Sequence, residues 1–249
     1  MSENIQKALE YAVELNNQKE IIQEVNGKRF YNLEMGRLVE LDGPAYADTL
    51  VVNTLTGLVE YLQSKFDETS KKEPESLLIN IQNPEKVAVY SQLNVDRKRE
   101  NLITAVASLD KFPYGHFLDS EKFIINLQSL FTRELDAEAV LKCASSIRIE
   151  GGGDLNDNGV SQVATVKQGA ATVAKAEVPS PAELRPYRTF LEVEQPQSPF
   201  IFRINQRGDC ALFEADGGMW RMFAMQSIKT YLETELSESI EQGYLTIIA

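Results

Sequence analysis

Short β-type runs divided by tight-turn residues recur along this chain and restrict its fold more than any other feature. Three turn pairs have flanking runs of this kind: Asn26-Gly27, Asn83-Pro84 and Gln168-Gly169. These residues favour antiparallel hairpins, because they accept the backbone conformations that a short turn requires. We therefore expect hairpins at 21–32, 77–91 and 161–178.

Further strands and the helices follow from the spacing of apolar residues. Alternating or β-branched runs predict further strands at 49–52, 101–109, 187–195, 199–205, 211–215 and 244–249. Apolar residues at helical spacing, several of them after a capping residue, predict helices at 3–16, 54–67, 121–131, 136–147 and 219–240. The expected fold class is α+β, with two lobes of mainly antiparallel sheet and packed helices.

A change in composition at Gly151-Gly152-Gly153 suggests where the two lobes join. The segment 151–159 is rich in Gly, Asp and Asn and has no apolar periodicity, which is typical of a loop or hinge. We expect an N-terminal α+β lobe at 1–150 and a β-rich lobe with one long helix at 160–249.

The bulk composition is that of an acidic globular protein. Hydrophobic residues make up 43% and charged residues 25% of the chain, and the net charge is −12. No run approaches the roughly 18 apolar residues of a membrane span, and the N-terminal segment has no apolar signal core, so we expect a cytoplasmic protein without a membrane partner. The negative charge opposes direct DNA binding, and dense carboxylate rows typical of a DNA mimic are absent.

Catalytic motifs are not recognisable. His116 is the only histidine, it lies in an aromatic turn at 112–117, and Cys143 and Cys210 are far apart in sequence. Asp96-Arg97-Lys98 has the acid-to-lysine spacing of metal nucleases but lies in a run of charges typical of a solvated turn. We expect no catalytic residue and no cofactor, so the protein is predicted not to be an enzyme.

One segment resembles the first half of a calcium-binding loop. Residues 154–159 place Asp and Asn at alternate positions before Gly159, as calcium loops do. The twelfth position, where a bidentate Glu should stand, is Thr165. We therefore expect no metal site.

A basic and aromatic cluster in the second lobe is the strongest candidate for a binding site. Guanidinium groups bind phosphates in a bidentate manner, and aromatic rings stack on bases. Trp220 would add a ring at a helix N-terminus, a position that favours anions. The predicted ligand-binding residues are Arg185, Tyr187, Arg188, Arg203, Arg207 and Trp220.

The same cluster has a purely structural interpretation. Phe190, Phe200 and Phe202 would then belong to the core, and the arginines would pair with Glu192, Glu194 and Glu214. If 187–195 and 199–205 pair as antiparallel strands, Arg188 and Arg203 share the outer face under either interpretation.

A resemblance covers most of the chain. Residues 160–204, followed by ALFEADGGMWR at 211–221 and preceded by DTLVVNTLTGLVEYL at 48–62, resemble uncharacterised proteins of temperate phages and prophages of Gram-positive bacteria. More remotely, the C-terminal part is similar to the YfdQ-like family of unknown function in enterobacterial prophages. The resemblance implies a phage accessory protein in the host bacterial cytoplasm.

These observations favour a non-catalytic binding protein of counter-defence type. Its expected partner is an anionic, nucleotide-like immune signal, which it would sequester, or a host defence protein. An accessory factor of phage DNA replication or recombination that acts through protein partners remains an alternative, as does a hydrolase with an unrecognised site. The hairpin at 161–178 is too thin to be stable alone, so we also expect a homo-oligomer.

Overall fold

The fold is described from a computed structural model of the 249-residue chain. It divides into two compact units, Met1–Ala47 and Asp48–Ala249, each treated by itself below. The structure describes residues 2–17, 22–25, 27–32, 38–41, 46–67, 76–146, 156–157, 162–168, 172–177 and 180–249.

The first unit contains one helix and a small antiparallel sheet. Helix α1 spans Ser2–Asn17, and the sheet has the order β1-β2-β3. Val25 pairs with Lys28 across the first turn, where Gly27 has a φ of 77°, a left-handed conformation that glycine adopts without strain. The hairpin predicted at 21–32 is therefore confirmed. The strands are β1 Ile22–Val25, β2 Lys28–Asn32 and β3 Leu38–Glu40.

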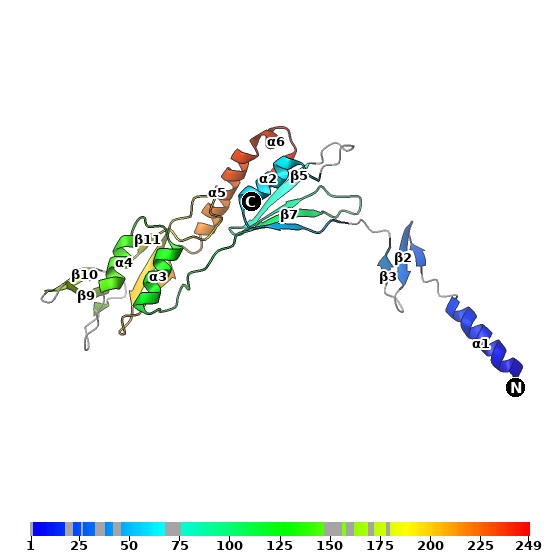
Figure 1. Ribbon diagram of the computed structural model, residues 1–249, viewed down its shortest axis with the longest axis horizontal. Coiled ribbons are helices and arrows are strands. Elements are labelled where there is room, and N and C mark those ends of the chain that lie inside the picture. Colours follow the sequence, from blue (N-terminus) through cyan, green and yellow to red (C-terminus); the bar gives the residue numbers. More distant parts are fainter. Residues whose placement is uncertain are drawn as a thin grey trace. The chain divides into compact units, whose positions relative to one another are not determined.

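A five-stranded mixed sheet is the largest element of the second unit (Figure 1). Its order is β14-β5-β6-β7-β4, in which β5, β6 and β7 form an antiparallel meander and the two outer strands pair in parallel. The strands at the two edges come from opposite ends of this unit. The bounds are β4 Leu50–Val52, β5 Leu77–Asn83, β6 Lys86–Tyr90, β7 Asn101–Val106 and β14 Leu245–Ile248.

Helices α2 (Leu55–Ser64), α5 (Trp220–Glu235) and α6 (Ser237–Glu241) pack on this sheet. The Thr54 side chain caps α2 by accepting a hydrogen bond from the Gly57 N–H. The single helix predicted at 219–240 is interrupted at Leu236. We call the buried interior the aliphatic core; its members include Leu55, Leu58, Ile79, Ile81, Val87, Val89, Ile103, Ile228 and Leu232.

The segment between β7 and α5, residues 107–219, carries a second core. An antiparallel sheet with the order β11-β12-β13 packs against α3 (Ser120–Leu130) and α4 (Ala137–Ser146). The strands are β11 Ala182–Leu184, β12 Ser198–Ile204 and β13 Cys210–Glu214. Because five phenylalanines are buried here, we call this interior the aromatic core: Phe112, Phe123, Phe131, Phe200 and Phe202.

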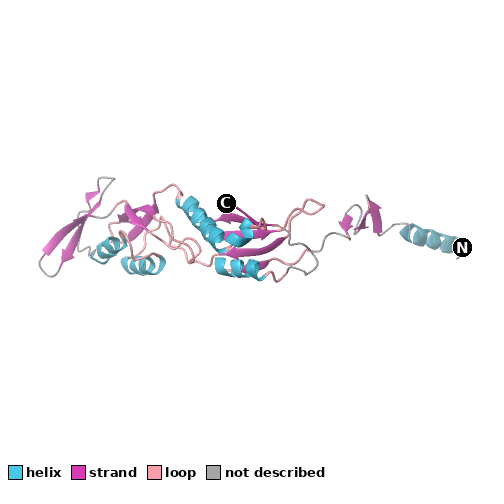
Figure 2. Ribbon diagram, turned by 90° about the horizontal axis from the view of Figure 1, so that it is seen from above, coloured by secondary structure: helices cyan, strands magenta, loops and turns pink. Residues whose placement is uncertain are grey.

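The same segment contains a small third sheet with the order β10-β9-β8. Two of its strands are labelled in Figure 1, and the sheet is drawn in magenta at the left of Figure 2. Strands β9 (Gln162–Gln168) and β10 (Thr172–Glu177) pair antiparallel, which confirms the hairpin predicted at 161–178. Strand β8 (Asn156–Asp157) falls inside the calcium-like segment, whose other four positions lie outside the described residues. Within the described ranges, no three His, Cys, Asp or Glu side chains are grouped as metal ligands.

The α+β fold class is shown, but two details differ from the expectation. Residues 187–195 form a loop and no strand, because the buried Gln195 side chain takes the hydrogen-bonding place of a partner strand. Its Oε1 accepts from the N–H groups of Arg188 and Thr189, and its Nε2 donates to the carbonyl of Phe190. Two apolar residues of this loop, Phe190 and Val193, enter the aliphatic core.

The chain also divides differently from the two lobes expected on either side of 151–159. The C-terminal β14 pairs with β5, which lies far upstream in sequence, so one sheet contains strands from both expected lobes. The division between compact units instead falls between Ala47 and Asp48. None of the helices in the described ranges has the length and apolar character needed to cross a membrane.

Candidate functional site

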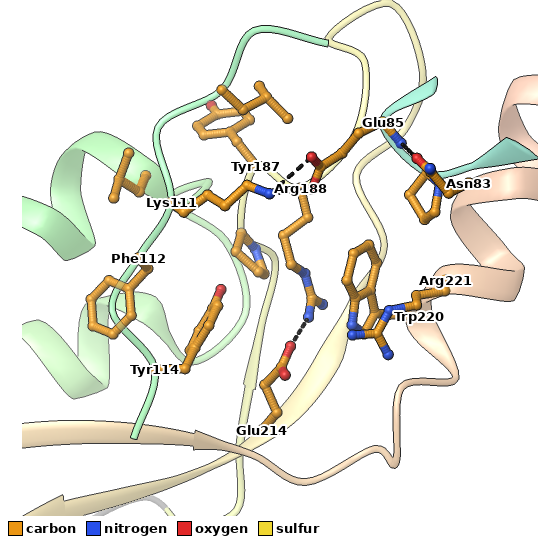
Figure 3. Close-up of a pocket in the computed structure, with 14 residues that line it drawn as sticks. Asn83, Glu85, Lys111, Phe112, Tyr114, Tyr187, Arg188, Glu214, Trp220 and Arg221 are labelled. Atoms are coloured by element: carbon orange, nitrogen blue, oxygen red, sulfur yellow. Dashed lines mark hydrogen bonds and ion pairs between the residues drawn. The ribbon is translucent and has the colours of Figure 1, made fainter. Parts of the chain in front are cut away.

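A cavity of about 420 Å³ lies where the aliphatic and aromatic cores meet (Figure 3). Its walls come from the β5–β6 turn, the segment after β7, the start of the 187–195 loop, the end of β13 and the first turn of α5. Thr189 donates a hydrogen bond of 2.6 Å to the carbonyl of Pro84 and so ties that loop to the turn. The lining residues are Asn83, Pro84, Glu85, Leu109, Lys111, Phe112, Tyr114, Leu130, Pro186, Tyr187, Arg188, Glu214, Trp220 and Arg221.

Arg188 is the most buried charged side chain of the wall, with 7% of its surface exposed. Its guanidinium forms an ion pair with Glu214 at 3.0 Å and donates a hydrogen bond to Ser198. The guanidinium carbon lies 4.3 Å from the centroid of the Trp220 ring and 5.4 Å from that of Phe200. Burial lowers the pKa of Arg188, and the Glu214 carboxylate opposes that shift. Arg188 is thus a charged but firmly held part of the wall.

Trp220 forms a flat surface beside Arg188. The guanidinium of Arg221 lies over the same indole, 5.0 Å from its centroid, and Trp220 is 7% exposed. The indole Nε1 is buried without a hydrogen-bond partner, as is the Nε of Arg188. Buried donors are normally paired, so the described contacts leave two donors of this wall unsatisfied.

The N-terminus of α5 is already occupied by a carboxylate. Asp216 accepts hydrogen bonds from the backbone N–H groups of Gly218 and Trp220 and from the Ser198 hydroxyl. Burial would raise the pKa of Asp216, but these hydrogen bonds and the charge of Arg188 hold it below its usual value. Trp220 does begin helix α5, as expected, and the Asp216 carboxylate holds the anion position at that N-terminus.

A second ion pair lies at the exposed side of the cavity. Lys111 Nζ contacts both carboxylate oxygens of Glu85, at 2.8 and 2.9 Å. The side chains of Lys111 and Glu85 are 70% and 36% exposed. Figure 3 shows this pair at the opposite end of the labelled residues from Glu214, with Arg188 between them.

Tyrosines complete the wall. Tyr114 stacks on Phe200, with ring centroids 5.4 Å apart. Burial raises the pKa of Tyr114, although the charge of Arg188 partly offsets this effect. Tyr114 is therefore a neutral phenol at physiological pH, able to donate a hydrogen bond.

The structure brings together only part of the predicted ligand site. Tyr187, Arg188 and Trp220 line the cavity, whereas the other three predicted residues do not. Arg203, on β12, donates a hydrogen bond of 3.4 Å to Ser180, and Arg207 is exposed in the β12–β13 turn. Arg188 and Arg203 thus do not share a strand-pair face, because Arg188 lies in a loop.

Arg185 and the phenylalanines follow the structural interpretation. Arg185 forms ion pairs with Glu134 at 2.8 Å and with Glu194 at 3.2 Å. The structural interpretation also expects an ion pair between an arginine of the cluster and Glu214, and Arg188 forms it. The three phenylalanines of the cluster are all core residues: Phe190, Phe200 and Phe202.

Sequence reasoning missed the cavity residues that lie outside the cluster. Lys111 and Glu85 are 26 positions apart, so no local spacing pairs them. Tyr114 lies in the aromatic turn at 112–117, outside the basic cluster. Arg221 could have been found from the sequence, because it directly follows Trp220, a predicted ligand-binding residue. No periodicity connects these positions, because the fold alone brings them to one cavity.

The other candidates for chemistry lie elsewhere. His116 is exposed and does not line the cavity. Burial raises the pKa of the Cys210 thiol to about 12 and also raises that of Cys143, so both are poor nucleophiles. The Asp96-Arg97-Lys98 segment forms a turn in which Asn94 accepts a hydrogen bond from the Lys98 N–H.

Comparison with known proteins identifies no relative. No family model matches the sequence. No curated protein and no solved structure is significantly similar to it.

Proposed function

We propose that the protein is a non-catalytic binding protein that holds one nucleotide-like molecule in the cavity beside Arg188 and Trp220. The observation that carries the proposal is the combination of flat surfaces with cationic groups in one cavity of about 420 Å³. Small-molecule sites span about 300–1,000 Å³. This volume is at the lower end, which favours a mononucleotide-sized ligand over a dinucleotide.

The charges of the wall support an anionic ligand. Lys111, Arg188 and Arg221 contribute three positive charges, and Glu85 and Glu214 contribute two negative ones, which leaves the wall at +1. The whole chain carries −12, so the side chains that line the cavity differ in net sign from the chain. A ligand with an anionic group and a planar ring would meet both the cations and the indole.

The residue types of the wall favour binding without catalysis. Among its lining residues there is no His, Cys, Ser or Thr, and both carboxylates are in ion pairs. The commonest nucleophilic side chains are thus missing from the lining, and a hydrolase would have to use Lys111, Tyr114 or Tyr187 as its acid or base. We therefore place binding ahead of hydrolysis in the proposal.

The resemblance to phage and prophage proteins supplies the biological setting of the proposal. In the cytoplasm of an infected bacterium, such a protein would act in counter-defence by sequestering a nucleotide-derived immune signal. A homo-oligomer would increase the number of sites per particle.

A second candidate is a factor that acts through a protein partner, such as a host defence protein or a component of phage DNA metabolism. The observation that favours it is an exposed apolar surface at the start of α5. Met219, Met222 and Phe223 are 58%, 74% and 58% exposed. Exposed apolar patches of this kind often mark protein interaction sites.

The full-length protein should be incubated with cyclic nucleotides, nucleoside monophosphates and ADP-ribose derivatives, washed, denatured and analysed for released ligand by mass spectrometry. We expect release of an unchanged mononucleotide-sized compound. Arg221→Ala should weaken retention by about tenfold, since a charge-assisted contact is lost. Arg207→Ala, an exposed arginine outside the cavity, is the matched control and should retain the ligand normally. Altered product would indicate a hydrolase, and no retention would favour a protein partner.

A further inference from the structure

The two ion pairs of the cavity differ in how firmly each cation is held. Arg188 is 7% exposed, and besides Glu214 it contacts Ser198 and the rings of Trp220 and Phe200. Lys111 is 70% exposed, and its ammonium group contacts the carboxylate of Glu85. Displacing a carboxylate from Arg188 would leave a buried charge unpaired, whereas exposed ion pairs contribute little to stability. Of the two ion-paired cations, Lys111 is therefore the one that an incoming anion can reach more easily.

The backbone around Glu85 is fixed on both sides. Its N–H donates to the Asn83 side chain at 2.9 Å, and its carbonyl accepts from the Ala107 N–H at 2.8 Å. The carbonyl of the preceding Pro84 accepts the hydrogen bond from Thr189. The turn thus presents the Glu85 carboxylate at the cavity, and only the side chain is able to move aside.

We propose that the anionic group of the ligand binds Lys111 in the position that the Glu85 carboxylate now occupies. This inference rests on the proposed function. Glu85 makes with the Lys111 ammonium the same two oxygen contacts that a ligand phosphate or carboxylate would make. Glu85 is thus an internal competitor that sets the affinity of the cavity for anionic ligands.

A competitor of this kind discriminates between ligands by charge alone. An anionic ligand must displace the Glu85 carboxylate and then tolerate it nearby as a like charge. A neutral ligand with the same ring leaves the Lys111–Glu85 pair in place. Removing the charge at position 85 should therefore strengthen binding of the anionic ligand and leave that of the neutral one unchanged.

The test is calorimetric titration of the full-length protein with matched pairs of compounds: adenosine, guanosine, cytidine and uridine, and the 5′-monophosphate of each. Wild type, Glu85→Gln, Lys111→Gln and the control Arg207→Gln are compared. For the monophosphate that binds best, Glu85→Gln should lower Kd by about tenfold and Lys111→Gln should raise it by about tenfold. The parent nucleoside should change by less than about twofold in each variant.

The outcomes separate this inference from the proposed function. If wild type binds a monophosphate that Glu85→Gln binds no more tightly, the proposal that Glu85 competes with the ligand is wrong, while the proposed binding site stands. If Glu85→Gln lowers the Kd of the nucleoside as much as that of its monophosphate, Glu85 acts through its shape and not its charge, and the inference is overturned. If no compound binds either wild type or Glu85→Gln, both proposals fail. Because Glu85 is half-buried and its ion pair is with the exposed Lys111, its variant should unfold close to the wild-type temperature, which circular dichroism checks.

Discussion

The two cores of the second unit are built from different side chains. The aliphatic core beneath the five-stranded sheet consists mainly of Leu, Ile and Val from regular elements. Phe190 is its one aromatic member among the described buried residues. The aromatic core of the 107–219 segment contains five phenylalanines, with Phe123 stacked on Phe202 at 5.4 Å. Phe190 belongs in sequence to this second segment and is buried in the first core.

This difference shows how one loop joins the two cores and shapes the cavity between them. Arg188 lies beside Phe200 of the aromatic core, and two positions later Phe190 enters the aliphatic core. Thr189, between them, is hydrogen-bonded to the β5–β6 turn. The cavity therefore depends on both cores being correctly joined, and the following predictions test this dependence.

The largest effect is expected from removing the loop's anchor in the aliphatic core. Phe190→Ala should lower the free energy of unfolding by about 3–5 kcal/mol, because a fully buried ring leaves a cavity. Urea denaturation followed by circular dichroism measures this change. Leu191→Ala, at a neighbouring position that is 67% exposed, should change it by less than about 0.5 kcal/mol. A loss below about 1 kcal/mol for Phe190→Ala would mean that the loop does not join the cores as described.

A smaller loss is expected when the loop keeps its anchor but loses its internal hydrogen bonds. Gln195→Ala leaves the buried N–H groups of Arg188 and Thr189 without their acceptor, which should lower the free energy of unfolding by about 2–3 kcal/mol. Gln197→Ala, an exposed glutamine two positions later, should have almost no effect. Equal stability of the two variants would show that the Gln195 hydrogen bonds do not stabilise this loop.

The smallest effect is expected for the pH dependence of stability that Asp216 contributes. This residue links Ser198, near the cavity wall, to the N-terminus of α5. The pKa of Asp216 is lower in the folded protein than the usual value near 3.9. Its stabilisation is therefore complete above the unfolded pKa and is lost as the pH falls through the lower, folded value. Thermal melts between pH 7 and pH 2 should show a smaller acid-induced drop for Asp216→Asn than for wild type. An identical drop would assign the acid sensitivity to other carboxylates.

The local elements were predictable because each depends on neighbours in sequence. The hairpins at 21–32 and 161–178 and helix α2 were found where turn residues or helical spacing indicated them. Residues 187–195 were mispredicted because their alternation resembles that of a strand. The Gln195 side chain forms hydrogen bonds with the backbone of its own loop, in place of the bonds that a partner strand would make. Strand propensities do not include such side-chain bonds.

The sequence by itself determined the α+β class and most helices and hairpins, and it left the burial of Phe200 and Phe202 open between two interpretations. It also identified Tyr187, Arg188 and Trp220, three residues that line the cavity. Only the tertiary structure decided that Arg185, Arg203 and Arg207 lie elsewhere and that Lys111, Glu85 and Tyr114 belong to the site. The physical reason is that periodicity specifies which face a residue takes within its own element. The cavity is formed by elements that meet through the parallel pairing of β14 with β5 and through a loop that spans two cores.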